Sequence, residues 1–251
     1  MAKAKDESAE ITITPLKRVT VRLRIIGTTP LFQNRMTNKF KQTMLVGGKK
    51  PSKADRARIK HDPVQEFRES AEILSDGPTA LGLRVVAVKA AMCTAALETP
   101  GLTKTSTQRL LFMPGEFFPL YGTPQIRMDV TRSADVKRTA DVRTRAFLPR
   151  WGVEVTISFI VPQLSVQGIV ALLCNAGVLV GVGDYRQEKG KGAFGSFRVI
   201  GEGENDPEWN DLVKNHGRKA QEKALADPVY ADRDTEDLME FYGTEVKRRA
   251  A

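Results

Sequence analysis

The stretch from Val178 to Val199 holds the residue types best suited to binding a polyanion. Its glycines, cations and aromatic residues are Gly181, Gly183, Gly190, Gly192, Gly195, Arg186, Lys189, Lys191, Tyr185, Phe194 and Phe197. Glycine lets backbone N–H groups turn outward, and successive outward N–H groups form a concavity that binds anions. Cations add charge that phosphate favours, and aromatic rings offer stacking surfaces for bases. We therefore expect this glycine loop (residues 181–195) to bind nucleic acid; the alternative is a solvated hairpin without a ligand.

Two nucleotide-binding motifs are excluded by the residues of this loop. A dinucleotide fingerprint needs a third glycine in register and a helix that follows a strand. Here Gly181-Val182-Gly183 is followed by Asp184-Tyr185-Arg186, and the next segment has the pattern of a strand. A phosphate-binding Walker loop needs Gly-Lys followed by Ser or Thr, whereas Gly192 is followed by Ala193-Phe194.

The charge of the chain points to an acidic partner. The 251 residues carry a net charge of +9 and are 41% hydrophobic, which is enough for a core. Residues 1–201 hold 31 Lys and Arg against 17 Asp and Glu, a balance of +14, whereas residues 202–251 hold 8 against 13, a balance of −5. The basic body favours nucleic acid as the partner, and the acidic tail stands apart from it.

The cations that we expect to contact phosphate lie on the first strand, in two basic insertions and in the glycine loop. They are Arg22, Arg24, Arg35, Lys39, Lys41, Arg127, Arg132, Lys137, Arg138, Arg143, Arg145, Arg186, Lys189 and Lys191. Tyr185 joins them as a site residue. Trp151, Phe194 and Phe197 are further stacking candidates, and each also fits the role of a packing residue.

Catalysis has little support in the residue types of this chain. Metal-independent RNA cleavage needs a general base near the 2′-hydroxyl, and histidine is the usual one. The chain has two histidines. His61 lies beside a basic segment but also beside a predicted helix start, and His216 lies in the acidic tail. We expect no catalytic residue.

Metal-binding patterns are equally weak. The carboxylates Asp129, Asp135 and Asp141 are spaced among arginines, which favours ion pairs over a metal site. The Asp184 and Glu188 pair could hold a cation or fix a neighbouring arginine. The two cysteines, Cys93 and Cys174, lie in apolar helical patterns and fit small core residues. We expect no metal and no cofactor.

Periodicity and capping signals predict the elements that must position these residues. Strict alternation predicts strands over 17–26 and 152–161. Capping residues predict a helix that starts after Asp62 and runs to Leu74 and another that starts at Ser165, and an alanine-rich run predicts a helix over 85–97. The remaining predictions are short strands over 108–112, 117–121, 125–130, 178–180 and 194–200, a helix over 165–176, a basic loop over 33–61, a basic hairpin over 127–150 and a helical tail after 204.

This order predicts an α+β fold of the ferredoxin-like βαββαβ type, as in RNA-recognition modules. The expected domain covers residues 17–201, with basic insertions at about 28–82 and 99–150. A flexible N-terminus (1–16) precedes it, and an acidic helical extension (202–251) follows it, packing weakly on the body or docking on a neighbouring subunit. With both helices on one face of an antiparallel sheet, the other face stays free, and single strands bind there in modules of this topology.

One run of this chain carries a family resemblance. It reads Ala176-Gly177, Gly181-Val182-Gly183, Arg186, Gly190-Lys191-Gly192 and Phe194-Gly195, and the first strand ends in Gly27-Thr28-Thr29-Pro30-Leu31. The run resembles the glycine-rich loop of the RAMP superfamily, the ferredoxin-like RNA-binding proteins of CRISPR complexes. The whole chain is also similar to a group of tailed-phage proteins in which the Pro30-Leu31 turn, the Trp151 strand and a Gly-x-Gly-x-x-Arg loop recur.

The resemblance implies a non-catalytic, sequence-independent protein that binds single-stranded DNA or RNA and forms a homo-oligomer along the strand. An RNA endonuclease of the same superfamily is one alternative, and a structural or partner-recruiting protein is another. We expect no membrane partner, because no apolar run approaches the roughly 18–20 residues that a membrane span needs. The N-terminus also lacks the apolar core of a secretory signal, so the expected compartment is the cytoplasm.

Overall fold

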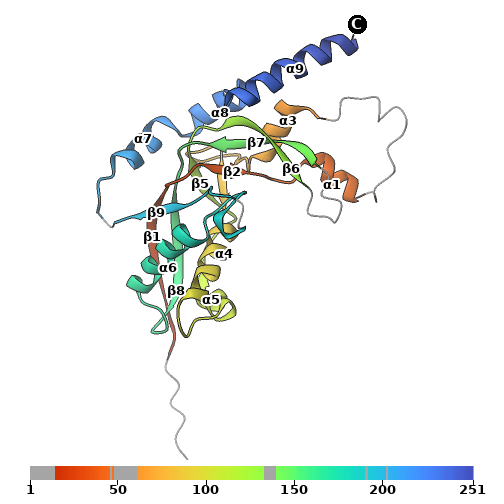
Figure 1. The fold of residues 1–251 in the computed structure, drawn as a ribbon. Coiled ribbons are helices and arrows are strands. Elements are labelled where there is room, and N and C mark those ends of the chain that lie inside the picture. The colour runs from red at the N-terminus through yellow and green to blue at the C-terminus, as the bar shows by residue number, and fades with distance from the viewer. Residues whose placement is uncertain are drawn as a thin grey trace, which may run out of the picture.

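The computed structural model describes residues 15–45, 47, 61–132, 140–189, 192–201 and 203–250. It is an α+β structure with two antiparallel sheets (Figure 1). The larger sheet has the order β3-β5-β8-β1-β9, with β4 paired to β8, and the smaller has the order β2-β7-β6. The strands are β1 (Lys17–Gly27), β2 (Leu31–Gln33), β3 (Gly82–Arg84), β4 (Leu111–Phe112), β5 (Phe117–Tyr121), β6 (Gln125–Arg132), β7 (Ala140–Leu148), β8 (Gly152–Val161) and β9 (Phe197–Ile200).

The other elements of the fold are helices. The first part of the chain supplies α1 (Asn38–Leu45), α3 (Pro63–Ser70), α4 (Val85–Ala95), the 3₁₀ turn η1 (Ala96–Glu98) and α5 (Lys104–Leu110). The second part supplies α6 (Val166–Leu179), the 3₁₀ turn η2 (Gln187–Lys189), α7 (Pro207–Asn215), α8 (Arg218–Ala226) and α9 (Arg233–Ala250).

The pair β1 and β8 forms the centre of the larger sheet. The strands pair antiparallel from Lys17 opposite Val161 to Ile26 opposite Gly152. Both were predicted from alternation, and the prediction is confirmed. Alternation places Leu23, Ile25 and their β8 partners on one face, where α4 and α6 cover them and pack on each other. The opposite face therefore carries the polar side chains of both strands.

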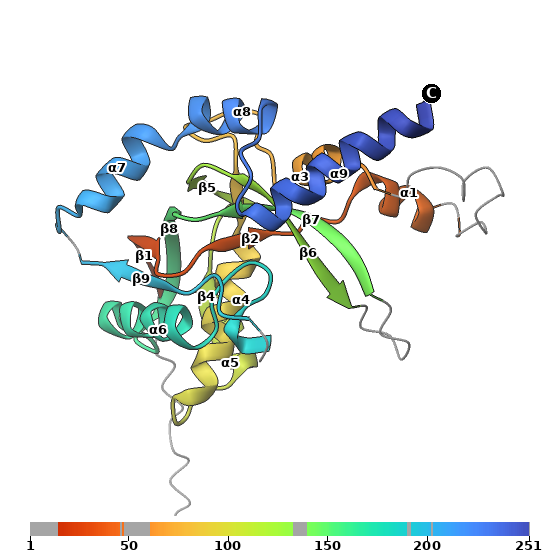
Figure 2. The same ribbon diagram turned by 45° about the horizontal axis from the view of Figure 1, so that its top comes forward.

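The smaller sheet consists of the predicted basic hairpin and one added strand. Strands β6 and β7 pair from Gln125 opposite Phe147 to Arg132 opposite Ala140, and β2 pairs with β7 on its other edge. Helix α3 packs on β7, and the hydroxyl of Ser70 ties the two together by accepting a hydrogen bond from the N–H of Ala146 at 2.8 Å. The hairpin extends to the far side of the molecule from β1 (Figures 1 and 2).

The C-terminal helices pack on the chain's own body. Trp209 and Leu212 of α7 form a buried cluster with Ile26 and Ile200, at one end of the larger sheet. Gln221 of α8 is fully buried and bonds five backbone groups: its side-chain oxygen accepts from two N–H groups, and its amide donates to three carbonyls. The tail is therefore anchored to the body, in contrast to the expected weak packing.

Three local predictions were wrong. Residues 38–45 of the predicted basic loop form α1, and α5 replaces most of the strand predicted over 108–112. Thr103 and Ser106 close a capping box that starts α5. Helix α6 runs to Leu179, where a strand was predicted. Gly177 lies inside this helix. Glycine is required there because a Cβ would lie 2.1 Å from the carbonyl oxygen of Phe197 on β9.

One further boundary differs from the prediction. The helix that begins after Asp62 ends at Ser70, short of the predicted Leu74, although Asp62 caps it as expected.

In the described part of the chain, no helix is both long and apolar enough to cross a bilayer.

Candidate nucleic-acid interface

Four backbone N–H groups in the described part of the glycine loop point inward. The N–H of Gly181 donates to the carbonyl of Ala176 at 2.8 Å, and that of Val182 donates to the carbonyl of Gly195 at 2.9 Å. The N–H of Gly195 donates to Pro30 at 2.8 Å, and that of Asp184 to Phe32 at 3.1 Å. These groups are satisfied by carbonyls and do not form the expected anion-binding concavity.

The glycines are required because backbone segments approach closely in this loop. Gly195 has a φ of +74°, and a Cβ there would lie 1.7 Å from the carbonyl oxygen of Val182. At Gly192 a Cβ would lie 1.6 Å from the carbonyl oxygen of Tyr185. Gly181 and Gly183 also have positive φ. The loop thus closes on itself and on β2, while Gly190, Lys191 and the side chain of Lys189 lie outside the described part.

Arg145, a predicted phosphate contact, is buried in the structure. Its guanidinium donates to Asp184 and to Asp129, each at 2.8 Å, and lies 4.5 Å from the ring centroid of Phe32 and 4.3 Å from that of Tyr185. Its side chain is 2% exposed, so the guanidinium does not reach a phosphate on the surface. Arg145 instead joins the hairpin, which carries Asp129, to the glycine loop, which carries Asp184.

Most of the expected stacking rings are packing residues. Trp151 and Phe197 are buried and pack edge to face, and the indole N–H of Trp151 donates to the carbonyl of Thr29 at 2.8 Å. Phe194 is half-buried and contacts Phe32 and Phe147 edge to face. Tyr185 is half-buried, and its ring stacks against the guanidinium of Arg145. These rings pack against the interior of the protein and leave little exposed ring surface on which a base could stack.

The other predicted cations are divided between internal pairs and open surface. Arg127 stacks over Phe147 and pairs with Asp129 and Asp232, and Arg186 pairs with Glu188 at 2.8 Å. Lys41, Arg132 and Arg143 are exposed on α1 and on the hairpin. Lys39 lies in α1 with its side chain outside the described part, and Lys137 and Arg138 lie wholly outside it.

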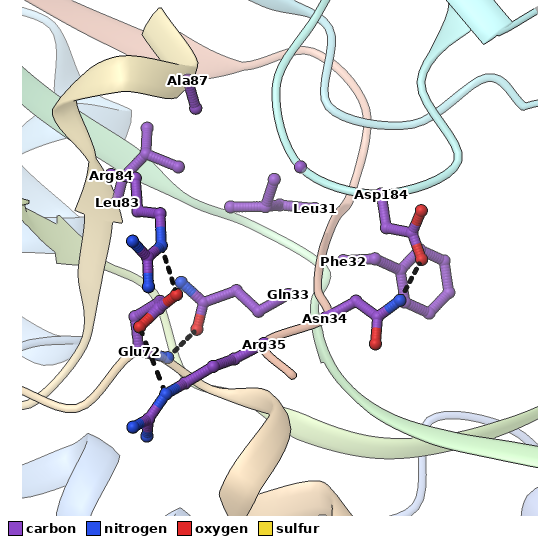
Figure 3. Close-up of a pocket in the computed structure, with 11 residues that line it drawn as sticks. Leu31, Phe32, Gln33, Asn34, Arg35, Glu72, Leu83, Arg84, Ala87 and Asp184 are labelled. Carbon is purple, nitrogen blue, oxygen red and sulfur yellow. Dashed lines mark hydrogen bonds and ion pairs between the residues drawn. The ribbon is translucent and has the colours of Figure 1, made fainter. Parts of the chain in front are cut away.

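A pocket of about 230 Å³ lies between β2, the start of α4 and the glycine loop (Figure 3). Arg84 and Arg35 both turn toward Glu72, with N–O distances of 2.6 and 3.6 Å, and Asn34 donates to Asp184 at 2.8 Å. Two carboxylates balance the two guanidinium groups, so the charge of this pocket does not favour an anion.

The open face of the larger sheet carries cations in a row. We use this name for the face opposite α4 and α6, made by Arg18, Thr20, Arg22, Arg24, Phe112, Thr156, Ser158 and Ile160. Its three arginines alternate along β1, about 7 Å apart for neighbours two residues from each other, because two residues of a strand rise by that distance. Arg24 lies 3.8 Å from Glu154, with both side chains nearly half exposed. Within the described residues, Arg18 and Arg22 form no ion pair.

An exposed aromatic ring shares this face. Phe112 of β4 is 48% exposed and lies opposite Ser158 of β8, which donates or accepts a hydrogen bond with Thr20 of β1 at 2.7 Å. The guanidinium of Arg18 lies 4.9 Å from its ring centroid. The sequence analysis missed Phe112, and its place on the open face follows from pairing with a strand that comes much later in the chain.

The histidines and carboxylates are held in structural pairs. His61 places Nδ1 2.7 Å from Glu66 and Nε2 3.1 Å from Asp141, so both ring nitrogens are occupied. His216 bonds the hydroxyl of Thr123 at 2.7 Å. Among the described residues, no three or more His, Cys, Asp or Glu side chains are placed to hold a metal ion.

The carboxyl of Asp206, at the start of α7, has a clearly altered pKa. Burial opposes ionisation of Asp206, but hydrogen bonds from Arg198 and from the backbone N–H groups of Trp209 and Glu208 outweigh it and lower the pKa below its ordinary value. Asp206 caps α7, the helix that covers the β9 end of the open face. The ionised carboxyl of Asp206 therefore stabilises the start of the helix that bounds the open face.

A scan against models of protein families found no matching family, and a search of curated proteins found no matching relative. The functional argument therefore rests on the geometry of the open face.

Proposed function

We propose that this protein binds single-stranded nucleic acid, without sequence preference, on the open face of its larger sheet. One observation carries the proposal: Arg18, Arg22 and Arg24 stand in a row on β1, and the exposed ring of Phe112 lies next to Arg18 on the same face. Proteins that bind single strands combine a positive surface that follows the phosphates with rings on which bases stack.

The arrangement of elements supports the same proposal. In chain order, β1, α4, β5, β8, α6 and β9 follow the ferredoxin-like pattern βαββαβ, with both helices on one face. We propose this fold for the larger sheet. Modules with this topology bind RNA on the free face, through aromatic residues of the strands. Duplex recognition would instead use a helix or ribbon that enters a groove.

Side-chain chemistry of the open face favours binding without base readout. Arginine contacts phosphate as a charge, and a phenyl ring stacks on any base. The hydroxyl groups of Thr20 and Ser158 are bonded to each other. The row therefore offers position and charge rather than a pattern of donors and acceptors for one base.

The test is fluorescence anisotropy with labelled 30-mer ssDNA, ssRNA and duplex DNA, for the wild type and for Phe112→Leu. We expect both single strands, or one of them, to bind more tightly than the duplex. Loss of one stacked base costs about 1–3 kcal/mol, so Phe112→Leu should weaken single-strand binding about tenfold. The matched control is Phe241→Leu on α9, because Phe241 is 67% exposed and lies away from the open face. Equal affinities of the two variants would overturn the proposal.

A further inference from the structure

Strand β9 covers only part of the edge of β1. It pairs Phe197–Ile200 with Arg24–Gly27, whereas β8 pairs with β1 from Lys17 to Ile26 on the other edge. From Lys17 to Leu23, the β9-side edge of β1 has no partner strand within the described chain. An open strand edge is a template on which another strand can pair.

A groove runs beside this open edge. Its volume is about 390 Å³, and it lies between β1, the first three turns of α6 and the end of β9. Its apolar lining residues are Val21, Leu23, Val166, Val170, Cys174, Val199 and Ile200. Val166 is 40% exposed, and Val21, Val170 and Cys174 are only partly covered. An added strand with apolar side chains on the α6 side would bury this surface.

The chain itself contains a segment with that pattern. Residues 10–14, which lie outside the described part, read Glu-Ile-Thr-Ile-Thr and directly precede Pro15. This alternation of β-branched residues is the pattern of a half-buried strand, so pairing with another strand would put Ile11 and Ile13 on one face and Thr12 and Thr14 on the other. Added to β1, it would place the isoleucines in the groove and the threonines beside the open face.

The connection to β1 argues against pairing within one chain. A tight hairpin would turn through Pro15 and Leu16, and its favoured turn types need a positive φ at the first central residue. Proline is fixed near −65° and does not adopt that value. We propose that residues 10–14 of a second copy of this chain pair with the open edge of β1 and fill the groove beside α6. This inference does not depend on nucleic-acid binding.

Cys174 provides a native probe of this arrangement, because it lines the groove. In Ile13→Cys, the new thiol of one copy should reach Cys174 of the other and form a disulfide, which requires Cβ atoms about 4 Å apart. Burial raises the pKa of the Cys174 thiol, so the oxidation with diamide is done at about pH 9. Thr12→Cys is the matched control, because in the proposed added strand its side chain would point to the opposite face.

The decisive version of the experiment mixes two proteins. One is a double variant that carries both Ile13→Cys and Cys174→Ser, and the other is the wild type. Only a bond between chains can then join the thiol introduced at position 13 to Cys174. We expect a dimer on a non-reducing gel, a disulfide-linked pair of peptides spanning these two positions in its digest, and at least fivefold less of either with Thr12→Cys. A bond that forms only within a single chain of Ile13→Cys, or no bond to Cys174, would overturn the inference. The crosslinking experiment contains no nucleic acid, so its failure can be distinguished from a failure of the anisotropy test.

Discussion

At the scale of single residues, the environment decides what an arginine does. Arg145 and Arg22 were both predicted to contact phosphate, yet their surroundings differ. Arg145 is enclosed by two carboxylates and two rings, whereas Arg22 stands on the open face. A buried arginine with its charge paired holds elements together, and an exposed one can meet a phosphate.

We predict that Arg145→Met lowers the free energy of unfolding by about 2–4 kcal/mol. Removing one partner of a buried pair costs about 3–5 kcal/mol, and the cost is smaller here because the carboxylates of Asp129 and Asp184 are partly exposed. Urea unfolding followed by circular dichroism measures it. Arg143→Met, on the exposed surface of the same strand, should change stability by less than about 0.5 kcal/mol. Similar losses in both variants would show that Arg145 does not join the hairpin to the loop.

The stacking residues illustrate what a single sequence hides. Trp151 and Phe197 have the residue types of a nucleic-acid surface, but both are buried. Phe112 is exposed because β4 pairs with β8 at the edge of the sheet. Whether a ring is buried depends on contacts between distant segments, which periodicity within one segment does not reveal.

At the scale of elements, local signals predicted the long strands and the capped helices. Alternation placed β1 and β8, and Asp62 and Ser165 cap α3 and α6 as expected. The errors occur where a distant contact overrides the local signal. The helix predicted over 165–176 stops before Gly177, but Gly177 lies inside α6, where the absence of a side chain lets Phe197 of β9 approach closely. The glycine loop is a second example, because the N–H of Asp184 turns inward to the carbonyl of Phe32 on β2, which lies far away in the sequence.

The cap of α7 predicts a dependence on pH. Because the pKa of Asp206 is lowered in the folded state, its ionised form stabilises the fold above the unfolded pKa of about 4. This contribution is lost as the pH falls through the folded pKa. Asp206→Ala should therefore lower stability by about 1 kcal/mol at pH 7, and the difference from wild type should shrink as the pH falls below about 4. Urea titrations monitored by tryptophan fluorescence at pH 7 and pH 3 test this.

The control for this titration is Asp227→Ala, because Asp227 follows α8 and does not cap α7. It should show little loss at either pH. A loss for Asp206→Ala that is the same at pH 7 and pH 3 would contradict the role of the ionised cap.

At the scale of the whole molecule, the acidic tail neutralises selected parts of the basic body. Asp206 bonds Arg198, Asp211 bonds Arg150, and Asp232 pairs with Arg127. These pairs lie within one chain, so the charge difference between body and tail does not by itself call for docking on a neighbour. They do not involve Arg18 and Arg22 of β1, so the positive charge of these two residues stays available on the open face.

The salt dependence of binding tests the central claim most directly. The affinity for single-stranded 30-mers is measured by anisotropy over a range of NaCl for wild type, for Arg18→Gln with Arg22→Gln, and for the hairpin control Arg132→Gln with Arg143→Gln. Each lost phosphate contact should reduce the slope of log affinity against log salt by about 0.7, so we predict a slope flattened by about 1.4 for the β1 variant and nearly unchanged for the hairpin variant. An unchanged slope for the β1 variant, with a flattened one for the hairpin variant, would contradict binding on the open face.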